Sequence, residues 1–479
     1  MKEGYIKKEQ RKRILLLCDD LRLHSGVGNV AKEMVTNTAH HYNWFNLGGA
    51  INHPEVGKRF DLSEAIKDES GVEDAEVMVQ PNNGYGSPEQ IRRLLKEFKF
   101  DAIFLITDPR YFSWLFQIEN EIRKDIPIIY LNIWDDYPAP MYNKAFYESC
   151  DALFGISKQT VNINKLTLGE KSKDKVIKYV PHGLNEQVFI PITKENSDYE
   201  EYIKFKESVF QNEDIEFVLF FNSRNIRRKQ IPDALLAWKY FYDKLPKEKQ
   251  SKVKFLLHTE IVSEHGTDLM AVKDYLFGED DKSIGFSTSK LDRKQLNYLY
   301  NLADAQILLT SNEGWGLSLT EALLSGTPII ANTTGGMQDQ MRFVDEEGNW
   351  FTPSADVPSN HTGKYKSHGK WAFPCYPTSR NLVGSPTTPY IWDDHCSPED
   401  ASAHIKTLYD MSSEERVALG QSGREWAMSD EAGFTAKKMG GRIIEGVDEL
   451  FSTWKPRKSY EFINVNDVKL PTVPHKLLY

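Results

Sequence analysis

Residues 305–336 read AQILLTSNEGWGLSLTEALLSGTPIIANTTGG, and this stretch decides the fold. Ala305–Thr310 has the apolar, β-rich composition of a buried parallel strand. It ends in a loop with two glycines, helix-like residues begin near Ser318, and a second apolar run follows at Thr327–Ala331. Strand, loop, helix and strand in this order predict an α/β domain with a mainly parallel sheet.

The loop in this stretch also predicts a ligand site. Loops at the carboxyl ends of parallel strands are where α/β proteins bind ligands, and the free N–H groups of a helix start attract anions. Glu313 and Glu321 lie eight residues apart, so they can hold hydroxyl groups at two ends of an elongated ligand while amides between them hold phosphates. The alternative is that Glu321 is an ordinary first-turn helix acid and Glu313 a solvated loop residue.

The same alternation of strands and helices extends in both directions and predicts two successive α/β halves. Expected strands are Ile14–Cys18, Trp44–Leu47, Ala102–Thr107, Ile126–Ile133, Ala152–Gly155 and Ile177–Val180 in the first half, then Ile215–Phe221 and Lys252–His258 before the stretch already quoted. Expected helices include Asn29–Thr38, Pro88–Phe98, Pro232–Leu245, Gln295–Leu302 and Ala436–Trp454.

These elements predict an N-terminal Rossmann-like domain at 1–190 and a C-terminal one at 214–438. Residues 191–213 are polar and acidic, and they predict a linker or an exposed helix. Residues 344–398 are dense in Pro, Gly, Ser and aromatic side chains, and they predict an insertion with little regular structure. Residues 439–479 are expected to form a final helix and a tail.

The composition excludes several classes of protein. The chain has 479 residues, of which 40% are hydrophobic and 27% charged, so disorder and fibrous repeats are disfavoured. The net charge of −10 disfavours a globally basic nucleic-acid binder, although a local basic surface stays open. No apolar run reaches the ~20 residues of a membrane span, the charged N-terminus does not resemble a secretory signal, and four cysteines are too few for a disulfide framework. A cytoplasmic location is the expectation.

A second group of candidate residues follows the expected strand Ile215–Phe221. Arg224 and Lys229 can both reach a diphosphate, the first as a planar fork and the second as a point charge. The alternative is a solvated basic turn, which is the simpler interpretation of Arg227 and Arg228. Cations at a helix start oppose its dipole, which weakens this alternative for at least one of them.

A third candidate is the glycine-containing segment Gly26–Ala31, in which Gly26 and Gly28 match the pattern G-x-G-x-x-A. This pattern alone is typical of an NAD-dependent oxidoreductase. About seven residues separate it from the preceding strand, however, and the next strand ends without the acid that binds a ribose. We therefore favour a loop that touches a phosphate or sugar beside a cleft, with a purely structural turn as the other alternative.

Three weaker signals complete the set. Asp135 follows the expected strand Ile126–Ile133, where it either contacts a hydroxyl group or caps a helix. His182, in Pro181–Gly183, is interpreted as a structural histidine. His368, Cys375, His395 and Cys396 do not have the spacing of a zinc site, so no metal is expected.

Residues 313–328, E-G-W-G-L-S-L-T-E-A-L-L-S-G-T-P, resemble the E-x7-E signature of retaining glycosyltransferases of the large fourth family, which have the two-domain GT-B fold. The pattern R-x4-K at Arg224 and Lys229, the Gly26/Gly28 loop and the P-x-G turn at Pro181–Gly183 stand in the expected order. The resemblance covers roughly residues 13–340 and the last long helix. It departs from the family at Asp135, near which a histidine is common.

The resemblance implies two Rossmann-like domains facing across a cleft, and metal-independent transfer of a hexose or pentose with retention of configuration. Arg224 and Lys229 would hold the donor diphosphate, and Glu321 would bind the ribose. Glu313 and Asp135 are the catalytic candidates, with Glu313 facing the donor sugar. Gly26 and Gly28 would approach from the other domain. The remaining donor contacts would come from the backbone of Gly314, Trp315, Gly316, Leu317, Ser318 and Leu319.

The implied donor is a nucleoside-diphosphate sugar, most simply a UDP-sugar, and no cofactor is expected. The acceptor hydroxyl stays open among saccharides, lipid-linked sugars and small metabolites, without stable membrane insertion. Residues 379–394 also loosely resemble glycosyltransferases of tailed phages, some of which modify 5-hydroxymethylcytosine in DNA, and this is the minority interpretation. DNA would need phosphate-facing cations, for which the candidates are Lys7, Lys8, Arg11, Lys12, Arg13, Arg227 and Arg228. A non-catalytic module with the same two-domain shape is a further alternative.

Overall fold

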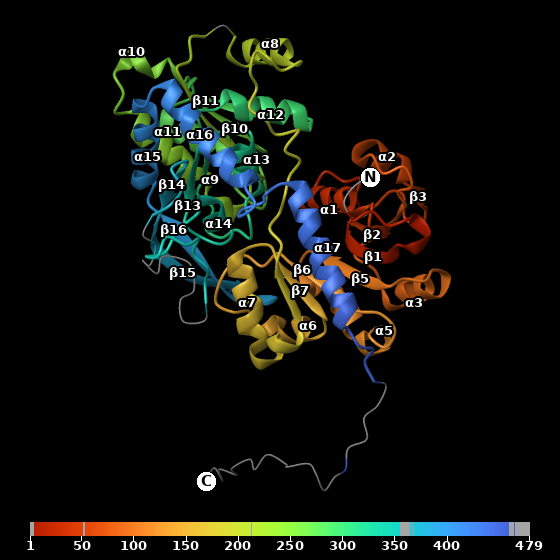
Figure 1. Cartoon of the computed structure of the whole chain (residues 1–479). Coiled ribbons are helices and arrows are strands. Elements are labelled where there is room, and N and C mark those ends of the chain that lie inside the picture. Colours follow the sequence, from red (N-terminus) through yellow and green to blue (C-terminus); the bar gives the residue numbers. More distant parts are fainter. Residues whose placement is uncertain are drawn as a thin grey trace, which may run out of the picture.

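The computed structural model describes residues 4–50, 53–211, 213–354, 365, 367–458 and 464 (Figure 1). Two sheets form the cores of two α/β domains. The first has eight strands in the order β3-β4-β2-β1-β5-β6-β7-β8, and the second has six in the order β11-β10-β9-β12-β13-β14. Every neighbouring pair in these sheets is parallel except β3–β4. The predicted fold class, two mainly parallel α/β domains, is confirmed.

The N-terminal domain carries the first sheet. Its strands are β1 Lys12–Asp19, β2 Tyr42–Ala50, β3 Phe60–Asp61, β4 Val77–Asn83, β5 Ala102–Ile106, β6 Ile128–Asn132, β7 Ala152–Gly155 and β8 Val176–Tyr179. Its α-helices are α1 Gly26–Thr38, α2 Ser63–Ser70, α3 Pro88–Glu97, α4 Ser113–Phe116, α5 Glu119–Ile122, α6 Lys144–Glu148 and α7 Lys158–Leu168. The sequence did not predict β4, because Gln80 and Pro81 interrupt its apolar run.

The C-terminal domain carries the second sheet. Its strands are β9 Phe217–Asn222, β10 Val253–His258, β11 Ile284–Ser287, β12 Ala305–Leu308, β13 Ile329–Asn332 and β14 Ala372–Cys375. Its α-helices are α8 Tyr199–Phe210, α9 Ile231–Tyr242, α10 Lys247–Gln250, α11 Leu269–Phe277, α12 Arg293–Leu302, α13 Leu317–Leu324, α14 Met337–Met341, α15 Pro398–Asp410 and α16 Ser413–Met428. The helix α8 occupies the polar segment for which the sequence left a linker or an exposed helix open.

The prediction that residues 344–398 have little regular structure is wrong for residues 372–396. Besides β14, this segment contains β15 Pro377–Ser385 and β16 Thr388–Cys396, which pair as an antiparallel hairpin. The prolines that suggested irregular structure stand where a strand tolerates them, because Pro377 begins β15 and Pro374 lies in the edge strand β14. Residues 355–364 and 366 of this segment lie outside the described residues.

The last long helix, α17 Ala436–Thr453, lies across the N-terminal domain beside α1 (Figure 1). Two glycines allow this close packing. A Cβ atom on Gly440 would lie 2.9 Å from the Cβ of Asn37, and one on Gly446 would lie 2.7 Å from Phe154 Cζ. The helix is also tied down by Asp448, whose carboxylate accepts a hydrogen bond of 2.7 Å from the Tyr42 hydroxyl.

The segment that leads into α17 passes directly over the turn at Gly183. The N–H of Leu184 donates to the Phe434 carbonyl at 3.2 Å, and the N–H of Ala436 donates to the Leu184 carbonyl at 2.8 Å. A Cβ atom on Gly183 would lie only 2.1 Å from the carbonyl oxygen of Thr435. The glycine of the P-x-G turn is therefore required by this crossing of the chain.

Substituting Gly183 with alanine is expected to lower the melting temperature by about 3 °C or more, because overpacking costs about 1–3 kcal/mol and the nearest neighbour, the Thr435 carbonyl, is backbone. Gly441→Ala in α17 is the matched control. No atom lies within 4 Å of its added Cβ, so the better helix propensity of alanine should raise the melting temperature slightly. Calorimetry measures the melting temperatures of both variants. A melting temperature of Gly183→Ala equal to that of the wild type would contradict the close packing of Gly183 against Thr435.

Candidate active site

The two domains meet where the loop after β12 faces the end of β6. A Cβ atom on Gly314 would lie 2.6 Å from the Ile133 carbonyl oxygen and 3.1 Å from Asp135 Oδ1. Further along the same interface, a Cβ atom on Gly26 would lie 3.6 Å from Leu317 Cδ1 at the start of α13. Glycine at position 314 is thus what allows the two loops to approach, and the Gly26 segment faces the other domain.

Glu313 lies in this interface between two cations. Its carboxylate accepts a hydrogen bond from Arg228 Nη1 at 2.9 Å and forms a close ion pair with Lys229 Nζ. Burial alone would raise the pKa of Glu313, but the charges of Arg228 and Lys229 outweigh it and hold the pKa at about 2. Glu313 is therefore ionised at neutral pH and fixes both cations at the carboxyl end of the sheet.

Asp135 stands across the interface from this group. Burial raises its pKa, the charge of Arg228 lowers it and the charge of Glu313 raises it. Two neighbouring carboxyl groups whose pKa values move in opposite directions are a common arrangement in active sites, since each can then take a different role. The structure brings Asp135 and Glu313, the two catalytic candidates from the sequence, to the same interface.

A cavity of about 480 Å³ opens beside these residues, within the range of small-molecule sites. Its walls come from the N-terminal domain, the C-terminal domain and the hairpin β15–β16. The lining residues are Asp108, Pro109, Arg110, Tyr130, Ile133, Trp134, Asp135, Arg228, Asn312, Val383, Gly384, Ser385, Thr388 and Ile391.

Glu321 lies within α13 and is partly buried. Its carboxylate accepts hydrogen bonds from the Tyr300 hydroxyl at 2.6 Å and from Asn222 Nδ2 at 3.1 Å. Burial is the main reason that its pKa rises to about 7, against the lowering effect of these hydrogen bonds. Glu321 is the fifth residue of α13 and not a first-turn acid, and Glu313 is ion-paired and not a solvated loop residue, so the structure does not fit that alternative.

The structure differs from the sequence interpretation in which basic residues after β9 lie at the site and which are exposed. Arg224 is exposed, and among the described residues its side chain has no hydrogen-bond or ion-pair partner. Lys229 is buried at Glu313, as expected for a site residue. The interpretation of Arg228 as part of a solvated turn is wrong, because this residue contacts Glu313 and lines the cavity. The only sequence signal that Arg228 belongs to the site was its unfavourable position as a cation at a helix start.

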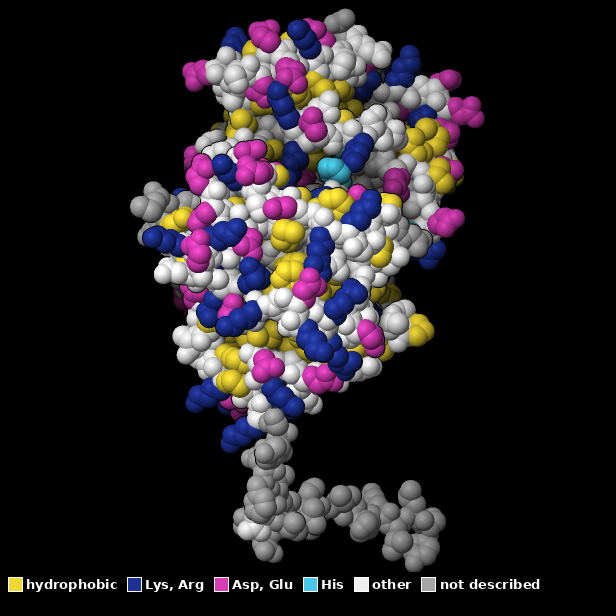
Figure 2. All heavy atoms as spheres, turned by 90° about the vertical axis from the view of Figure 1, so that its right-hand side faces the viewer, with side chains coloured by type: hydrophobic (Ala, Val, Ile, Leu, Met, Phe, Trp, Pro, Cys, Tyr) yellow, Lys and Arg dark blue, Asp and Glu magenta, His cyan; other side chains and the backbone are white. Residues whose placement is uncertain are grey.

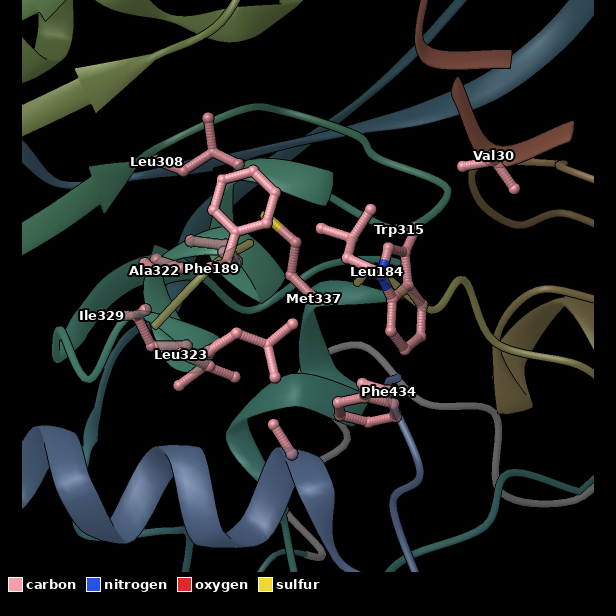
Figure 3. Close-up of a cluster of buried hydrophobic side chains, with 14 of the residues drawn as sticks. Val30, Leu184, Phe189, Leu308, Trp315, Ala322, Leu323, Ile329, Met337 and Phe434 are labelled. Carbon is pink, nitrogen blue, oxygen red and sulfur yellow. The ribbon is translucent and has the colours of Figure 1, made fainter. Parts of the chain in front are cut away.

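Trp315 serves the core rather than the cavity. Its indole N–H donates to Thr320 Oγ1 at 2.9 Å, and its ring packs against Phe434 at 4.9 Å between centroids. Figure 3 shows it among apolar side chains that include Leu184 and Phe434. Any ligand contact from Trp315 would therefore come from its backbone.

The start of α13 offers backbone N–H groups. Gly316 has φ +87°, a conformation that glycine adopts without strain, and it directly precedes the helix. The N–H groups of Leu317 and Ser318 lie in the first turn, which has no intrahelical acceptors for them. The N–H of Leu319 instead donates to the Gly316 carbonyl at 3.0 Å.

Gly28 has a local role. Its N–H donates to Ser25 Oγ at 3.0 Å, which caps α1, and an added Cβ atom would lie 2.9 Å from the Leu23 carbonyl oxygen. These contacts fit the alternative of a structural turn at Gly28, while Gly26 faces the second domain.

Sequence reasoning missed Asp108 and Arg110, which line the cavity after β5. Their only signal was a set of polar residues directly after a buried strand. The sequence also predicted that His182 is a structural residue, but it did not predict what His182 contacts. His182 is buried beside the Trp315 ring, and burial lowers its pKa to about 4.

Among the described residues, no group of three or more His, Cys, Asp or Glu side chains is arranged to hold a metal ion. Across the same residues, no helix is both long and apolar enough to cross a bilayer.

Comparisons with known proteins agree with this architecture. Residues 284–357 match the family model described as glycosyl transferases group 1. No curated protein matches the chain at a significant level of sequence similarity.

Solved structures with two-domain folds match nearly the whole chain. Anabaena HepE in complex with UDP and glucose has 13% identity and a TM-score of 0.60, covering 92% of this chain and 100% of that one. Sucrose-phosphate synthase of Thermosynechococcus elongatus has 15% identity and a TM-score of 0.60, covering 92% and 100%. A trehalose-6-phosphate protein of E. coli bound with UDP-2-fluoro glucose has 12% identity and a TM-score of 0.59, covering 91% and 99%. The segment 284–357 is thus similar to glycosyl transferases group 1, and the fold of nearly the whole chain is similar to that of these structures.

Proposed function

We propose that the chain transfers a sugar from a nucleoside-diphosphate sugar, with UDP as the expected nucleotide, to a hydroxyl acceptor. The observation that carries this proposal is the ion-paired group that Glu313, just before α13, forms with Arg228 and Lys229, opposite Asp135. Solved structures of the same fold hold UDP and UDP-sugars. We further propose that transfer retains the anomeric configuration and requires no metal.

In this proposal Lys229, Arg228 and the first-turn amides of α13 bind the diphosphate, and Arg224 stays a predicted contact. Fixed cations and amides stabilise the negative charge that develops when the bond from the sugar to the diphosphate breaks. Glu321 binds the ribose hydroxyls and Glu313 orients the donor sugar. The acceptor oxygen attacks the anomeric carbon from the face that the diphosphate leaves, and a leaving phosphate oxygen takes the acceptor proton. Asp135 positions the acceptor hydroxyl.

Nucleotide binding gives the first test. We expect UDP to raise the melting temperature, since a ligand present at a hundred times its Kd stabilises a protein by about 2.7 kcal/mol. The binding should be equal with and without EDTA. GDP and ADP are measured alongside, followed by hydrolysis of the corresponding nucleotide sugars. A shift with NADH and none with any nucleoside diphosphate would contradict the proposal and favour an oxidoreductase.

Hydroxymethylated DNA is a weaker candidate for the acceptor. Four of the five N-terminal cations proposed for it face acids: Arg11 pairs with Asp74 and Arg13 with Glu76, both at 2.5 Å, and Lys8 and Lys12 lie near Glu76 and Asp101. On the face seen in Figure 2, Lys and Arg are interspersed with Asp and Glu and do not gather in one patch. We therefore expect filter binding of hydroxymethylated duplex to be weak at both low and moderate salt. Tight binding that falls steeply with salt would support DNA instead.

A further inference from the structure

The hairpin β15–β16 is anchored at its base in the C-terminal domain. The N–H of Asp394 donates to the Ser311 carbonyl at 2.8 Å, and its carbonyl accepts from Asn332 Nδ2 at 2.7 Å. Its carboxylate accepts from Thr334 Oγ1 at 2.8 Å and from Arg380 Nε at 3.0 Å. Because Ser311 directly precedes the loop that carries Glu313, the base of the hairpin lies next to the candidate active site.

The hairpin then reaches the N-terminal domain. The N–H of Trp392 donates to the Tyr137 carbonyl at 2.9 Å, and the Tyr142 hydroxyl donates to the Tyr390 carbonyl at 2.9 Å. The rings of Tyr142 and Tyr390 pack edge to face at 4.9 Å. In Figure 1 the hairpin lies at the lower edge of the C-terminal domain, toward α7. It therefore bridges both domains beside the cavity.

Arg110 fastens the tip of the hairpin. Its guanidinium donates to the Thr387 carbonyl at 2.5 Å and to Thr388 Oγ1. The same guanidinium is held by Asp108, whose Oδ1 accepts from Arg110 Nε at 2.7 Å. This three-part contact between an N-terminal loop and the turn of the hairpin closes the cavity on the side of Val383, Gly384 and Ser385.

The backbone that carries Arg110 is strained. Thr107 has φ +112°, which is rare for a β-branched residue and costs on the order of 1–3 kcal/mol. The Thr107 carbonyl accepts a hydrogen bond of 3.0 Å from the buried Tyr130 hydroxyl, which holds it in place. Strain maintained directly before two cavity-lining residues is an independent sign that their position matters for function.

The lining of the cavity favours an uncharged ligand. Arg228 is assigned to the donor diphosphate, and the other cation of the lining, Arg110, is already paired with Asp108. An anionic acceptor would have to displace Asp108 from Arg110 and would also face Asp135. The apolar side chains Ile133, Trp134 and Ile391 offer surfaces for the C–H faces of a ring, and the carboxylates offer acceptors for its hydroxyl groups.

We propose that the hairpin β15–β16, latched by Arg110, is the roof of the acceptor pocket and restricts it to neutral saccharides of one or two rings. This inference rests on the proposed function. The roof excludes water from the anomeric carbon until an acceptor fills the pocket, so that the donor is transferred rather than hydrolysed.

Arg110→Ala tests the latch, with Tyr142→Phe as a milder second variant that keeps the ring. The control is Arg92→Ala, which removes a comparable surface ion pair with Glu121 in the same domain. Hydrogen–deuterium exchange should show at least threefold faster exchange in peptides from 377–396 for Arg110→Ala, a smaller increase for Tyr142→Phe and none for the control. If peptides from 377–396 exchange in Arg110→Ala at the wild-type rate, Arg110 does not hold the hairpin in place, whatever activity the enzyme has.

Activity is then measured as two separate rates. Without an acceptor, Arg110→Ala should hydrolyse UDP-glucose, or whichever nucleotide sugar the wild type hydrolyses, about three- to tenfold faster than wild type. Faster exchange with no rise in hydrolysis would show that the hairpin is not a roof. Absence of UDP binding in the wild type would instead refute the proposed function, and the exchange experiment would still report on the latch.

The acceptor class is tested on the wild-type protein with glucose, maltose, glucose 6-phosphate and a hydroxymethylated DNA duplex as probes. We expect transfer to a neutral saccharide to exceed transfer to glucose 6-phosphate at least tenfold. Equal or faster transfer to the phosphate ester, or transfer to the duplex alone, overturns the assignment of a neutral saccharide.

Discussion

Arg228→Ala should lower kcat/KM for the nucleotide sugar by about 10²- to 10³-fold, the loss typical when one group that stabilises developing charge is removed. Arg228 is the residue that links the two carboxyl groups of the site, through a hydrogen bond of 2.9 Å to Glu313 and a charge interaction with Asp135. Its removal leaves Lys229 as the one cation bound to Glu313 among the described residues. Steady-state kinetics of donor turnover measures the effect.

The neighbouring Arg227 is the matched control. It is exposed and lies one residue away in the same turn, so Arg227→Ala should stay within about twofold of wild type. Arg224→Ala separates the sequence prediction from the structure. A large loss with Arg224→Ala and little with Arg228→Ala would mean that Arg224 holds the diphosphate and that the Arg228 contact is only structural.

The contrast between Arg224 and Arg228 shows what the sequence could and could not predict. The strand, loop and helix of residues 305–336 follow from local composition and glycine positions, and the structure has them where expected. The direction of each basic side chain after β9 is set by a short helical turn at Arg227–Lys229 and by Gln230, whose φ is +51°. Such a conformation is rare for a residue other than glycine and is not readable from composition.

The cavity wall shows the same limit at longer range. Asp135 was predictable because it ends an apolar run. Arg110, held by Asp108, became a site residue only through its contact with Thr387 and Thr388, more than 270 residues away. The hairpin itself was hidden by its prolines and glycines, which suggested irregular structure. Contacts between distant segments create this part of the site, and no local pattern encodes them.

Glu321→Gln should change stability and nucleotide binding in opposite directions. Burial raises the pKa of this carboxyl to about 7 from an ordinary 4.5, so the folded protein binds its proton more tightly than the unfolded chain does. The stability that the bound proton contributes is fully present below pH 4.5 and is lost as the pH rises through 7. By pH 8 the loss is on the order of 3 kcal/mol, since the pKa rises from 4.5 to about 7 and one pKa unit corresponds to about 1.4 kcal/mol.

Glutamine avoids this loss and can still accept hydrogen bonds from Tyr300 and Asn222. Glu321→Gln should therefore melt about 2–5 °C above wild type at pH 8 and close to it at pH 5. UDP should bind about 10- to 100-fold more weakly at pH 8, because hydrogen bonds to a charged group contribute about 1.5–3 kcal/mol. Calorimetry at both pH values and a UDP titration measure the two effects.

Glu64→Gln is the control, because Glu64 is an exposed acid in the first turn of α2 and should change neither quantity. A Glu321→Gln protein that is less stable at pH 8 yet binds UDP normally would make Glu321 a structural residue. The opposite directions of the changes in stability and in UDP affinity are informative. A residue that serves only the fold is not expected to destabilise the protein when its side chain is ionised. A carboxylate that destabilises the empty protein fits a ligand-binding role, because a ligand, in our proposal the ribose, supplies the hydrogen bonds that burial took away.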